Sequence, residues 1–538
     1  MSDSSAVRAL MAPRRSGEAL VEPPLDAVAA LLERNAELPK SRVELLGRSL
    51  ADLAHLARTQ MLDEAVRYSR QYRDVPDIAP HLPRIVLAGH QPELFHPGVW
   101  FKNFVLDRLA RRHGAVAVNL VVDHDTCRQA SIRVPTGSPH QPAVERVAFD
   151  AVVNAVPWED RGIVDREVFR SFAQRAGTLL RPFVDEPLLE EVWPLAVDAM
   201  KRGAALGEAL AQARHAFEGR IGLTTLEVPL SSLCRGEAFA WFAAWLLHEA
   251  PHVRAVYNDA VHAYRRANRV RSASHPVPDL AVDGEYCESP LWVWSRSNPR
   301  RRHAFVARRS GGMTLTDREG WTCDIPAADA SPTAVVERLL ALDGEGIRLR
   351  PRALTTTWYA RTVLGDLFVH GIGGAKYDEV TDRIIADLFR IAPPAYLTAT
   401  ATLHLPVAHD AGASGKLREA KRRRRDLRYH AETVISSDDD HWRDAVRAKR
   451  ACIDEFRRAA PLPWRREAAR ERHRAVAAAN AAFAPWAANE LRSLDTEESR
   501  LAERLRVEQI LESREYAFCL FPRDAVVPML SDLAGEGR

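Results

Sequence analysis

The chain has 538 residues, more than a single hydrophobic core commonly supports, so we expect two to four domains. Hydrophobic residues make up 46% of the chain and charged residues 27%, which is typical of a globular protein and excludes a collagen-like or wholly disordered one. The formal net charge is only +3, which argues against a protein that coats nucleic acid.

The cysteines and the N-terminal residues indicate the compartment. No two of the six cysteines have the CxxC spacing of a zinc knuckle or a thioredoxin-like redox pair, and scattered cysteines are typical of a reducing cytoplasm. No apolar stretch follows Arg14 and Arg15, as a signal peptide requires, and no stretch approaches the ~18 apolar residues of a membrane span. We therefore expect a soluble, cytoplasmic protein with no membrane partner.

Residues 1–80 are predicted to form an N-terminal lead followed by helices. The first 24 residues are punctuated by prolines, and residues 26–72 have a helical pattern. Ser41 and Glu44 have the spacing of a capping box at a helix N-terminus.

A βαβ unit is predicted next. Residues 84–88 form a short apolar run that ends in the turn 89–92, residues 98–113 have apolar side chains at helical spacing, and Gly114 is a suitable C-cap. Residues 115–122 form a second, largely apolar strand of the kind found inside parallel sheets. The sequence therefore predicts an α/β protein with a parallel sheet.

The middle of the chain gives weaker signals. We predict helices and strands there from apolar spacing, with loop-like sequence over much of 265–299 and with inserted segments around 150–345. The predicted elements are helices over 194–217, 238–250 and 378–389, an apolar element over 354–368, and a β pair formed by 292–294 and 303–308.

Residues 411–515 are predicted to form a helical arm. Seven of the ten residues in 416–425 are basic, which is typical of a solvated helix face, and no interleaved aromatic residues favour nucleic acid. Four leucines occupy heptad positions over two heptads, too few to establish a coiled coil, and the stretch is interpreted as a helical arm or dimerisation element (Leu491, Leu494, Leu501 and Leu505). Residues 516–538 are apolar again and are expected to pack back on the core.

The first candidate site lies where the first predicted strand turns into a helix. Ligands of α/β sheets bind at the carboxyl ends of the strands, where a helix N-terminus favours phosphate or carboxylate groups. His90, Gln91, His96, Gly98 and Lys102 lie in this stretch, and we expect them to bind an anion.

The second candidate is the run Asp123, His124 and Asp125, directly after the second strand. On an extended backbone the two aspartates point one way and the histidine the other. The two carboxylates could then bind Mg²⁺ or a substrate amine, or act as a base and its orienting group.

The third candidate is the glycine cluster that begins at Gly371. Gly373 and Gly374 allow close approach of a ligand to the backbone, and Lys376 could reach a phosphate, although the spacing matches neither a Walker A loop nor GxGxxG. Pocket-lining candidates with less support are residues 288–292 and four arginines (Arg265, Arg266, Arg269 and Arg271).

These stretches resemble the bacillithiol-biosynthesis cysteine-adding enzymes. That family has a Gly-Gln-Gln turn, a Leu-Phe-x-Gly-Pro stretch, a helix with a lysine, and a strand that ends in Glu-Asp-His-Asp. Residues 89–91, 94–98, Lys102 and 123–125 are similar to these in order and spacing, and Leu-Arg-Pro at 349–351 followed by Gly-Gly at 373–374 matches two later motifs. The chain departs from the family pattern at His90, at residues 97–98, at Val122 and at the threonines 355–357, so the resemblance is to a divergent member.

The resemblance implies a Rossmann-like parallel-sheet core over 81–410 and a homodimer formed through the helical arm. It implies a ligase that condenses an amino acid, cysteine being one candidate, with an amino-sugar-type amine, using ATP or another nucleotide and optionally Mg²⁺. His90 and His96 would then stabilise phosphate charge, with Lys102 and Lys376 as phosphate ligands. Asp123 and Asp125 would bind the amine or a metal, while Gln91 and His124 orient the substrate. Two alternatives stay open, namely a nucleotidyltransferase that acts on another substrate and a non-catalytic scaffold.

Overall fold

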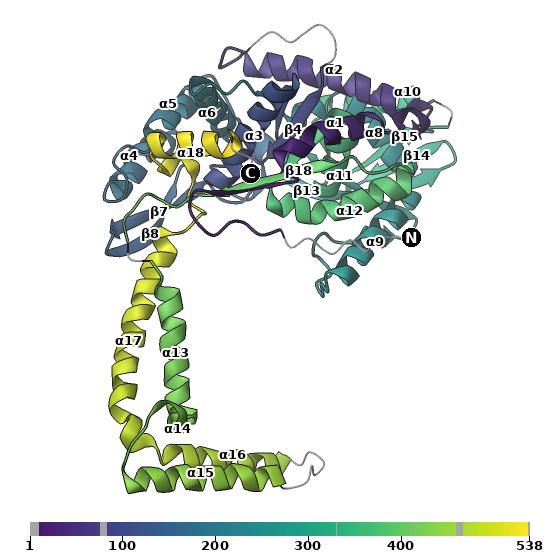
Figure 1. Cartoon of the computed structure of the whole chain (residues 1–538). Coiled ribbons are helices and arrows are strands. Elements are labelled where there is room, and N and C mark those ends of the chain that lie inside the picture. Colours follow the sequence, from purple (N-terminus) through teal and green to yellow (C-terminus); the bar gives the residue numbers. More distant parts are fainter. Residues whose placement is uncertain (1–9, 76–82, 330, 410, 459–465, 536–538) are drawn as a thin grey trace. The chain divides into compact units, whose positions relative to one another are not determined.

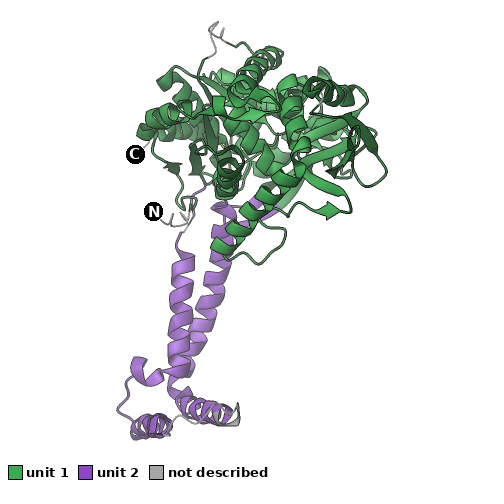
Figure 2. Ribbon diagram, turned by 90° about the vertical axis from the view of Figure 1, so that its right-hand side faces the viewer, with its two compact units in different colours: residues 1–134, 145–406, 514–538 green, residues 135–144, 407–513 purple. Residues whose placement is uncertain are grey.

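The computed structural model describes residues 10–75, 83–329, 331–409, 411–458 and 466–535. Helices make up 54% and strands 19% of it, so the chain is a mixed α/β protein, as predicted. It divides into two compact units (Figure 2): residues 1–134, 145–406 and 514–538 form the first, and residues 135–144 and 407–513 form the second. In the part of the chain described here, no helix combines the length and apolar character needed to cross a membrane.

A six-stranded sheet lies at the centre of the first unit, with strand order β1-β18-β17-β4-β5-β10 (Figure 1). The edge strand β1 pairs antiparallel with β18, and all other neighbours are parallel. The six strands are β1 (Glu18–Glu22), β4 (Ile85–His90), β5 (Val116–Val121), β10 (Leu226–Pro229), β17 (Leu367–His370) and β18 (Tyr396–Thr402).

The predicted βαβ unit is confirmed as β4, α3 (Pro97–His113) and β5. Helix α3 begins with a proline at its first turn and ends at Gly114, whose φ of 59° is the left-handed conformation expected of a C-cap. Ile85 and Leu87 belong to the large apolar core that also contains residues of the helix α2 (Leu50–Ser69). Val86, which lies between them, therefore faces the opposite side of the sheet.

The capping box predicted at Ser41 is wrong. The chain forms a 3₁₀ turn over Lys40–Arg42 and a small hairpin, and the long helix α2 (Leu50–Ser69) begins only after Ser49, whose side chain accepts from the N–H of Asp52. Ser49, with Asp52 three residues later, therefore caps a helix, rather than the predicted pair Ser41 and Glu44. The other elements in this part are a 3₁₀ turn at Leu25–Ala27, α1 (Val28–Ala36), β2 (Glu44–Leu45) and β3 (Arg48–Ser49).

The inserted segment contains helices and a second sheet. The single helix predicted over 194–217 is two helices, α5 (Leu189–Lys201) and α6 (Leu206–Arg220), with Pro194 inside the first rather than at its start. The remaining elements before residue 281 are β6 (Thr126–Cys127), β7 (Ser131–Ser138), β8 (Gln141–Ala148), β9 (Val156–Pro157), a 3₁₀ turn at Trp158–Asp160, α4 (Arg166–Leu180), α7 (Leu230–Leu233), α8 (Glu237–His248) and α9 (Ala250–Ala267).

The second sheet is antiparallel and includes the predicted β pair as β12 and β13. Part of the stretch interpreted as loop-like over 265–299 is strand, because residues 286–295 form β12, in which the run 287–291 is buried. Its strands are β11 (Val282–Asp283), β12 (Tyr286–Ser295), β13 (Asn298–Arg309), β14 (Gly312–Thr316), β15 (Thr322–Pro326) and β16 (Ile347–Pro351).

Helices connect this sheet to β17 and β18. The apolar element predicted over 354–368 is a helix, a short π-helical turn and a strand, and the predicted helix 378–389 starts earlier, inside the glycine cluster. These elements are α10 (Pro332–Gly344), α11 (Ala353–Tyr359), the π-helical turn Ala360–Leu364 and α12 (Ile372–Phe389).

The second unit contains a helical hairpin, formed by residues 413–429 and 484–511, and further helices between its two arms. Leu494 and Leu501 pack against Leu417 and Leu427 of the same chain, so part of the predicted coiled-coil stripe is covered without a second copy. Its helices are α13 (Ala413–Tyr429), α14 (Ala431–Val434), α15 (Asp440–Arg458), α16 (Arg466–Ala481) and α17 (Ala484–Leu511).

The C-terminal residues belong to the first unit. A 3₁₀ turn (Phe518–Leu520) precedes α18 (Arg523–Gly535), and the ring of Phe518 lies 4.7 Å from that of Trp100 in α3. Residues 516–521 are buried, so this segment completes the apolar packing beneath α3.

Candidate functional site

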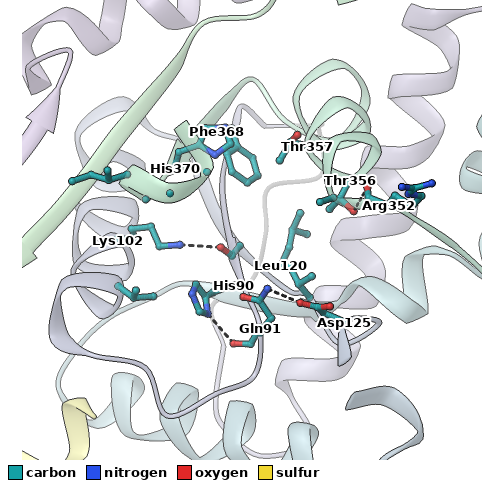
Figure 3. A pocket seen from close by; sticks show the side chains of 18 of the residues that line it. His90, Gln91, Lys102, Leu120, Asp125, Arg352, Thr356, Thr357, Phe368 and His370 are labelled. Atoms are coloured by element: carbon teal, nitrogen blue, oxygen red, sulfur yellow. Dashed lines mark hydrogen bonds between the residues drawn. The ribbon is translucent and has the colours of Figure 1, made fainter. Parts of the chain in front are cut away.

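A cavity of about 700 Å³ lies at the carboxyl ends of the parallel strands (Figure 3). The chain leaves β4 through α3 to reach β5 on one side, whereas β17 pairs with the other side of β4. This change of direction is the place where open α/β sheets bind ligands. The ends of β4, β5, β17 and β18 and the N-termini of α3 and α12 line the cavity.

Lys102 is a buried cation at one wall of the cavity. Its side chain is 4% exposed, and Nζ donates to the carbonyl oxygen of Gly89 at 2.9 Å. Among the described residues no carboxylate pairs with it. Burial, with the charge of Arg214 as a second cause, lowers the pKa of Lys102 to about 8. An anion placed in the cavity would stabilise the charged form of this side chain.

His90 and His96 line the same part of the cavity. Nδ1 of His90 lies 3.1 Å from the carbonyl oxygen of Gln91, and burial lowers its pKa to about 3. Nδ1 of His96 accepts from the N–H of Gly98 at 3.1 Å and so caps α3, and burial lowers its pKa to about 4. Both rings are therefore neutral at pH 7, so either would contact an anion by a hydrogen bond from a neutral ring.

Gly98 allows α3 to approach β18 closely. A Cβ atom at this position would lie 2.2 Å from the carbonyl oxygen of Ala401. The close approach brings Thr400 of β18 to the cavity, where its hydroxyl donates to the Gly98 carbonyl oxygen at 3.2 Å.

Gln91 and Asp125 meet in the cavity although they lie in different predicted motifs. Nε2 of Gln91 donates to Oδ2 of Asp125 at 2.9 Å, and Arg301 Nη2 lies 2.8 Å from Oδ1 (Figure 3 shows the first contact). Burial alone would raise the pKa of Asp125, but the Arg301 charge and the hydrogen bonds from Gln91 and Thr126 together hold it below its ordinary value.

Asp123 and Asp125 do not share a face. Strand β5 ends at Val121, and the turn that follows directs Asp123 to Ser231, whose backbone N–H donates to Oδ1 at 2.9 Å, while His124 and Asp125 line the cavity. The oxygens of both aspartates already accept hydrogen bonds, and no group of three or more possible metal-ligating side chains occurs in the described ranges. These residues therefore do not fit a metal held between the two carboxylates.

His124 is buried at 3% exposure, and its Nδ1 has no hydrogen-bond partner among the described residues. Burial lowers its pKa to about 4, against the raising effect of nearby carboxylates. The ring is therefore neutral at pH 7.

Trp292 of β12 lines the cavity next to two arginines. The guanidinium carbons of Arg301 and Arg352 each lie 4.9 Å from the centre of its rings. Arg352 pairs with the buried Glu288, which also lies 2.7 Å from Nδ1 of His303. Of the stretch 288–292, the cavity is lined by Trp292, whereas Glu288 holds Arg352 in place.

The four arginines suggested as pocket-lining do not line the cavity. Arg265 instead binds the carbonyl oxygens of His275 and Val277, at 3.0 and 2.7 Å. It thereby fixes the loop that brings Val277 and Pro278 to the cavity wall.

The glycine cluster reaches the cavity, but its lysine does not. Gly371, Gly373 and Gly374 line the cavity at the start of α12, which has no side-chain N-cap. Lys376 is exposed and does not line it.

His370, at the end of β17, was not predicted. Its Nε2 lies 2.8 Å from Oδ2 of Asp378, and Nη1 of Arg361 lies 2.5 Å from the same oxygen. Burial alone would raise the pKa of Asp378, but Arg361 and His370 hold it well below its ordinary value.

Other cavity residues that sequence reasoning missed are Arg301, Arg352 and Arg514. His370 and Arg352 had a usable signal, since His370 ends a strand and Arg352 directly follows one, each next to a motif already singled out. Arg514, which donates to Thr400 and Ala401 at 3.1 and 3.2 Å, had none.

Comparisons with known proteins identify no relative: no family model matches the chain, and no curated protein matches it.

Proposed function

We propose that the chain is a nucleotide-dependent ligase that forms a carbon–nitrogen bond between an amino acid, with cysteine as the first candidate, and an amino-sugar-type amine. The observation that carries the proposal is Lys102, a buried ammonium group that faces the cavity and has, among the residues that the structure describes, only a carbonyl oxygen as its partner. A buried cation without a carboxylate favours a bound anion.

The phosphates of the nucleotide would lie between Lys102 and the N-terminus of α12. Uncapped N–H groups at a helix start attract phosphate, and the glycines there let it approach the backbone closely. Mg²⁺ would enter with the phosphates, because it commonly keeps several waters and few protein ligands. The strand order supports a Rossmann-like core with its ligand at the switch between β4 and β17.

The opposite wall would hold the substrate that supplies the amine. Asp125 is kept ionised by Arg301 and can accept a hydrogen bond from an amine or hydroxyl group, and Trp292 offers an apolar face to a sugar ring. Activation of the amino-acid carboxylate by the nucleotide would take place between the two walls.

Calorimetric titration with ATP and Mg²⁺ tests the proposal. Lys102→Met is expected to weaken binding at least about ten-fold, since the charge-assisted contact is lost, whereas Lys376→Met, on an exposed residue outside the cavity, leaves binding unchanged. Mass spectrometry of reactions with cysteine and glucosamine then identifies the product. Absence of ATP binding by the wild-type chain contradicts the proposal, and a free nucleotidylated substrate without an amide favours the nucleotidyltransferase.

A further inference from the structure

His370 lies where the proposed reaction would take place. It ends β17, is 3% exposed and lines the cavity directly before the N-terminus of α12. Figure 3 shows His370 and Lys102 on the same side of the pocket. An amine that attacks a carboxylate activated near Lys102 would therefore come close to this ring.

A buried carboxylate fixes one side of the His370 ring. Nε2 lies 2.8 Å from Oδ2 of Asp378, which is 1% exposed and is kept ionised by Arg361 at 2.5 Å. Nε2 and Oδ2 are close but are not aligned as a hydrogen bond. The negative charge of Asp378 still favours the tautomer with its proton on Nε2, which leaves the lone pair on Nδ1.

The other ring nitrogen of His370, Nδ1, lies next to Gly374, a glycine of the cavity lining. A Cβ atom on Gly374 would lie only 2.9 Å from Nδ1, so the absence of a side chain at this cavity-lining glycine leaves room next to that nitrogen. Within the described part of the chain Nδ1 of His370 has no hydrogen-bond partner. Rings at 4.5 Å (Phe368) and 4.8 Å (Tyr396) hold the imidazole in place without using Nδ1.

Two other histidines of the cavity, His90 and His96, lack this arrangement. Nδ1 of His90 faces the carbonyl oxygen of Gln91, and Nδ1 of His96 accepts from Gly98. These two rings use Nδ1 for local backbone structure, whereas His370 combines an orienting carboxylate with a nitrogen that is left for a ligand.

We infer that His370 is a catalytic base, which takes the proton from the attacking amine when the amide forms. This inference rests on the proposed ligase function. The nitrogen lone pair attacks the carbonyl carbon of the activated amino acid, a C–N bond forms, and the C–O bond to the nucleotide-derived phosphate group breaks. The leaving phosphate keeps the electron pair of that bond, and Nδ1 of His370 takes the N–H proton. Asp378 is a positioning residue that stabilises the imidazolium ion formed.

Hydroxylamine separates this step from activation, because it is neutral at pH 7 and attacks activated carboxylates without a base. Wild-type protein, His370→Gln and His252→Gln are incubated with ATP, Mg²⁺ and cysteine, and either hydroxylamine or glucosamine. His252 is exposed on α9 and serves as the matched control. His370→Gln is expected to form the hydroxamate within about three-fold of the wild-type rate, while its amide formation falls about 100-fold or more, the usual contribution of a general base. His252→Gln is expected to match the wild type in both reactions.

Each result decides between the two proposals. Unchanged amide formation by His370→Gln, or equal loss of hydroxamate and amide in a variant that still binds ATP, overturns the role of His370 and leaves the ligase proposal standing. Absence of both products from the wild-type protein overturns both proposals. If His370→Gln does not fold, Asp378→Asn replaces it, and a selective loss of the amide, with a changed pH profile of its formation, is expected there as well. If Asp378→Asn reduces the rates of hydroxamate and amide formation by the same factor relative to wild type, the inference is contradicted.

Discussion

The side-chain amide of Gln91 donates to Oδ2 of Asp125 at 2.9 Å and thereby joins the turn after β4 to the turn after β5. Arg301 of β13 pairs with the same aspartate at 2.8 Å, so the antiparallel sheet is also tied to this edge of the parallel sheet. Asp125, in the turn after β5, consequently links two other parts of the first unit, the turn after β4 and strand β13. Asp123, only two residues away, has the opposite environment.

The opposite environments predict opposite pH effects. Burial, with Glu159 as the second cause, raises the pKa of Asp123 to about 7, above the ordinary value of about 3.9 for the unfolded chain. The folded state therefore binds the proton more tightly, and stability falls as the pH rises from about 4 to 7. Asp123→Asn cannot ionise and is expected to gain at least about 1 kcal/mol relative to wild type over this range, as measured by urea denaturation.

Asp125→Asn is the matched control for that measurement. The pKa of Asp125 lies below its ordinary value, so ionised Asp125 stabilises the fold above the unfolded pKa, and this contribution is lost as the pH falls through the folded pKa. The variant is therefore expected to lose stability relative to wild type as the pH rises. If the difference in stability between wild type and either variant does not change with pH, the pKa direction given for that aspartate is contradicted.

Nucleotide binding is expected to weaken at alkaline pH. Lys102 has a pKa of about 8, and a bound phosphate favours its protonated form, so the dissociation constant for ATP should rise up to ten-fold per pH unit above 8. Calorimetry between pH 7 and 9.5 measures this, and the dependence should disappear in Lys102→Met. Lys40 also has a pKa lowered to about 8, mainly by burial, but lies outside the cavity; Lys40→Met should therefore keep the wild-type dependence.

Gly98→Ala should destabilise the fold and weaken ligand binding. The added Cβ would lie 2.2 Å from the carbonyl oxygen of Ala401, and forced overpacking of this kind costs about 1–3 kcal/mol. Gly177→Ala, in the interior of α4 with no heavy atom within 4 Å of the added Cβ, should gain about 0.5–1 kcal/mol. Denaturation midpoints of the two variants check the contrast, and a neutral Gly98→Ala would show that α3 does not require this close approach to β18.

Arg361→Gln should be among the most destabilising single changes. It leaves Asp378 buried with its charge uncompensated by a guanidinium, a loss of about 3–5 kcal/mol for a buried pair. Arg383→Gln breaks an exposed pair with Asp387 on α12 and should change stability by less than about 1 kcal/mol. Equal effects in thermal denaturation would mean that the Arg361 pair does not stabilise the fold.

Local periodicity was sufficient to predict the unit β4–α3–β5. The apolar runs, Gly114 and the turn after residue 88 act over a few residues, so they carry their structural signal without the rest of the chain. The same reasoning failed where two local signals compete. Ser49 and Ser41 both precede an acidic residue by three positions, and only packing of the small hairpin formed by β2 and β3 decides which one caps α2.

For the candidate site, strand and turn patterns were enough to predict which turns reach the cavity, because parallel strands bring their carboxyl ends to one edge of a sheet. Gln91, His124, Asp125 and Gly373 were placed there in this way. The folded chain was needed to see that Asp123 turns to Ser231, that His370 has Asp378 beside it, and that Arg514 reaches the cavity from near the C-terminus. The physical reason is that backbone pattern and spacing are local properties, whereas side-chain direction after a strand end, and the charge that faces it, depend on contacts between segments far apart in the sequence.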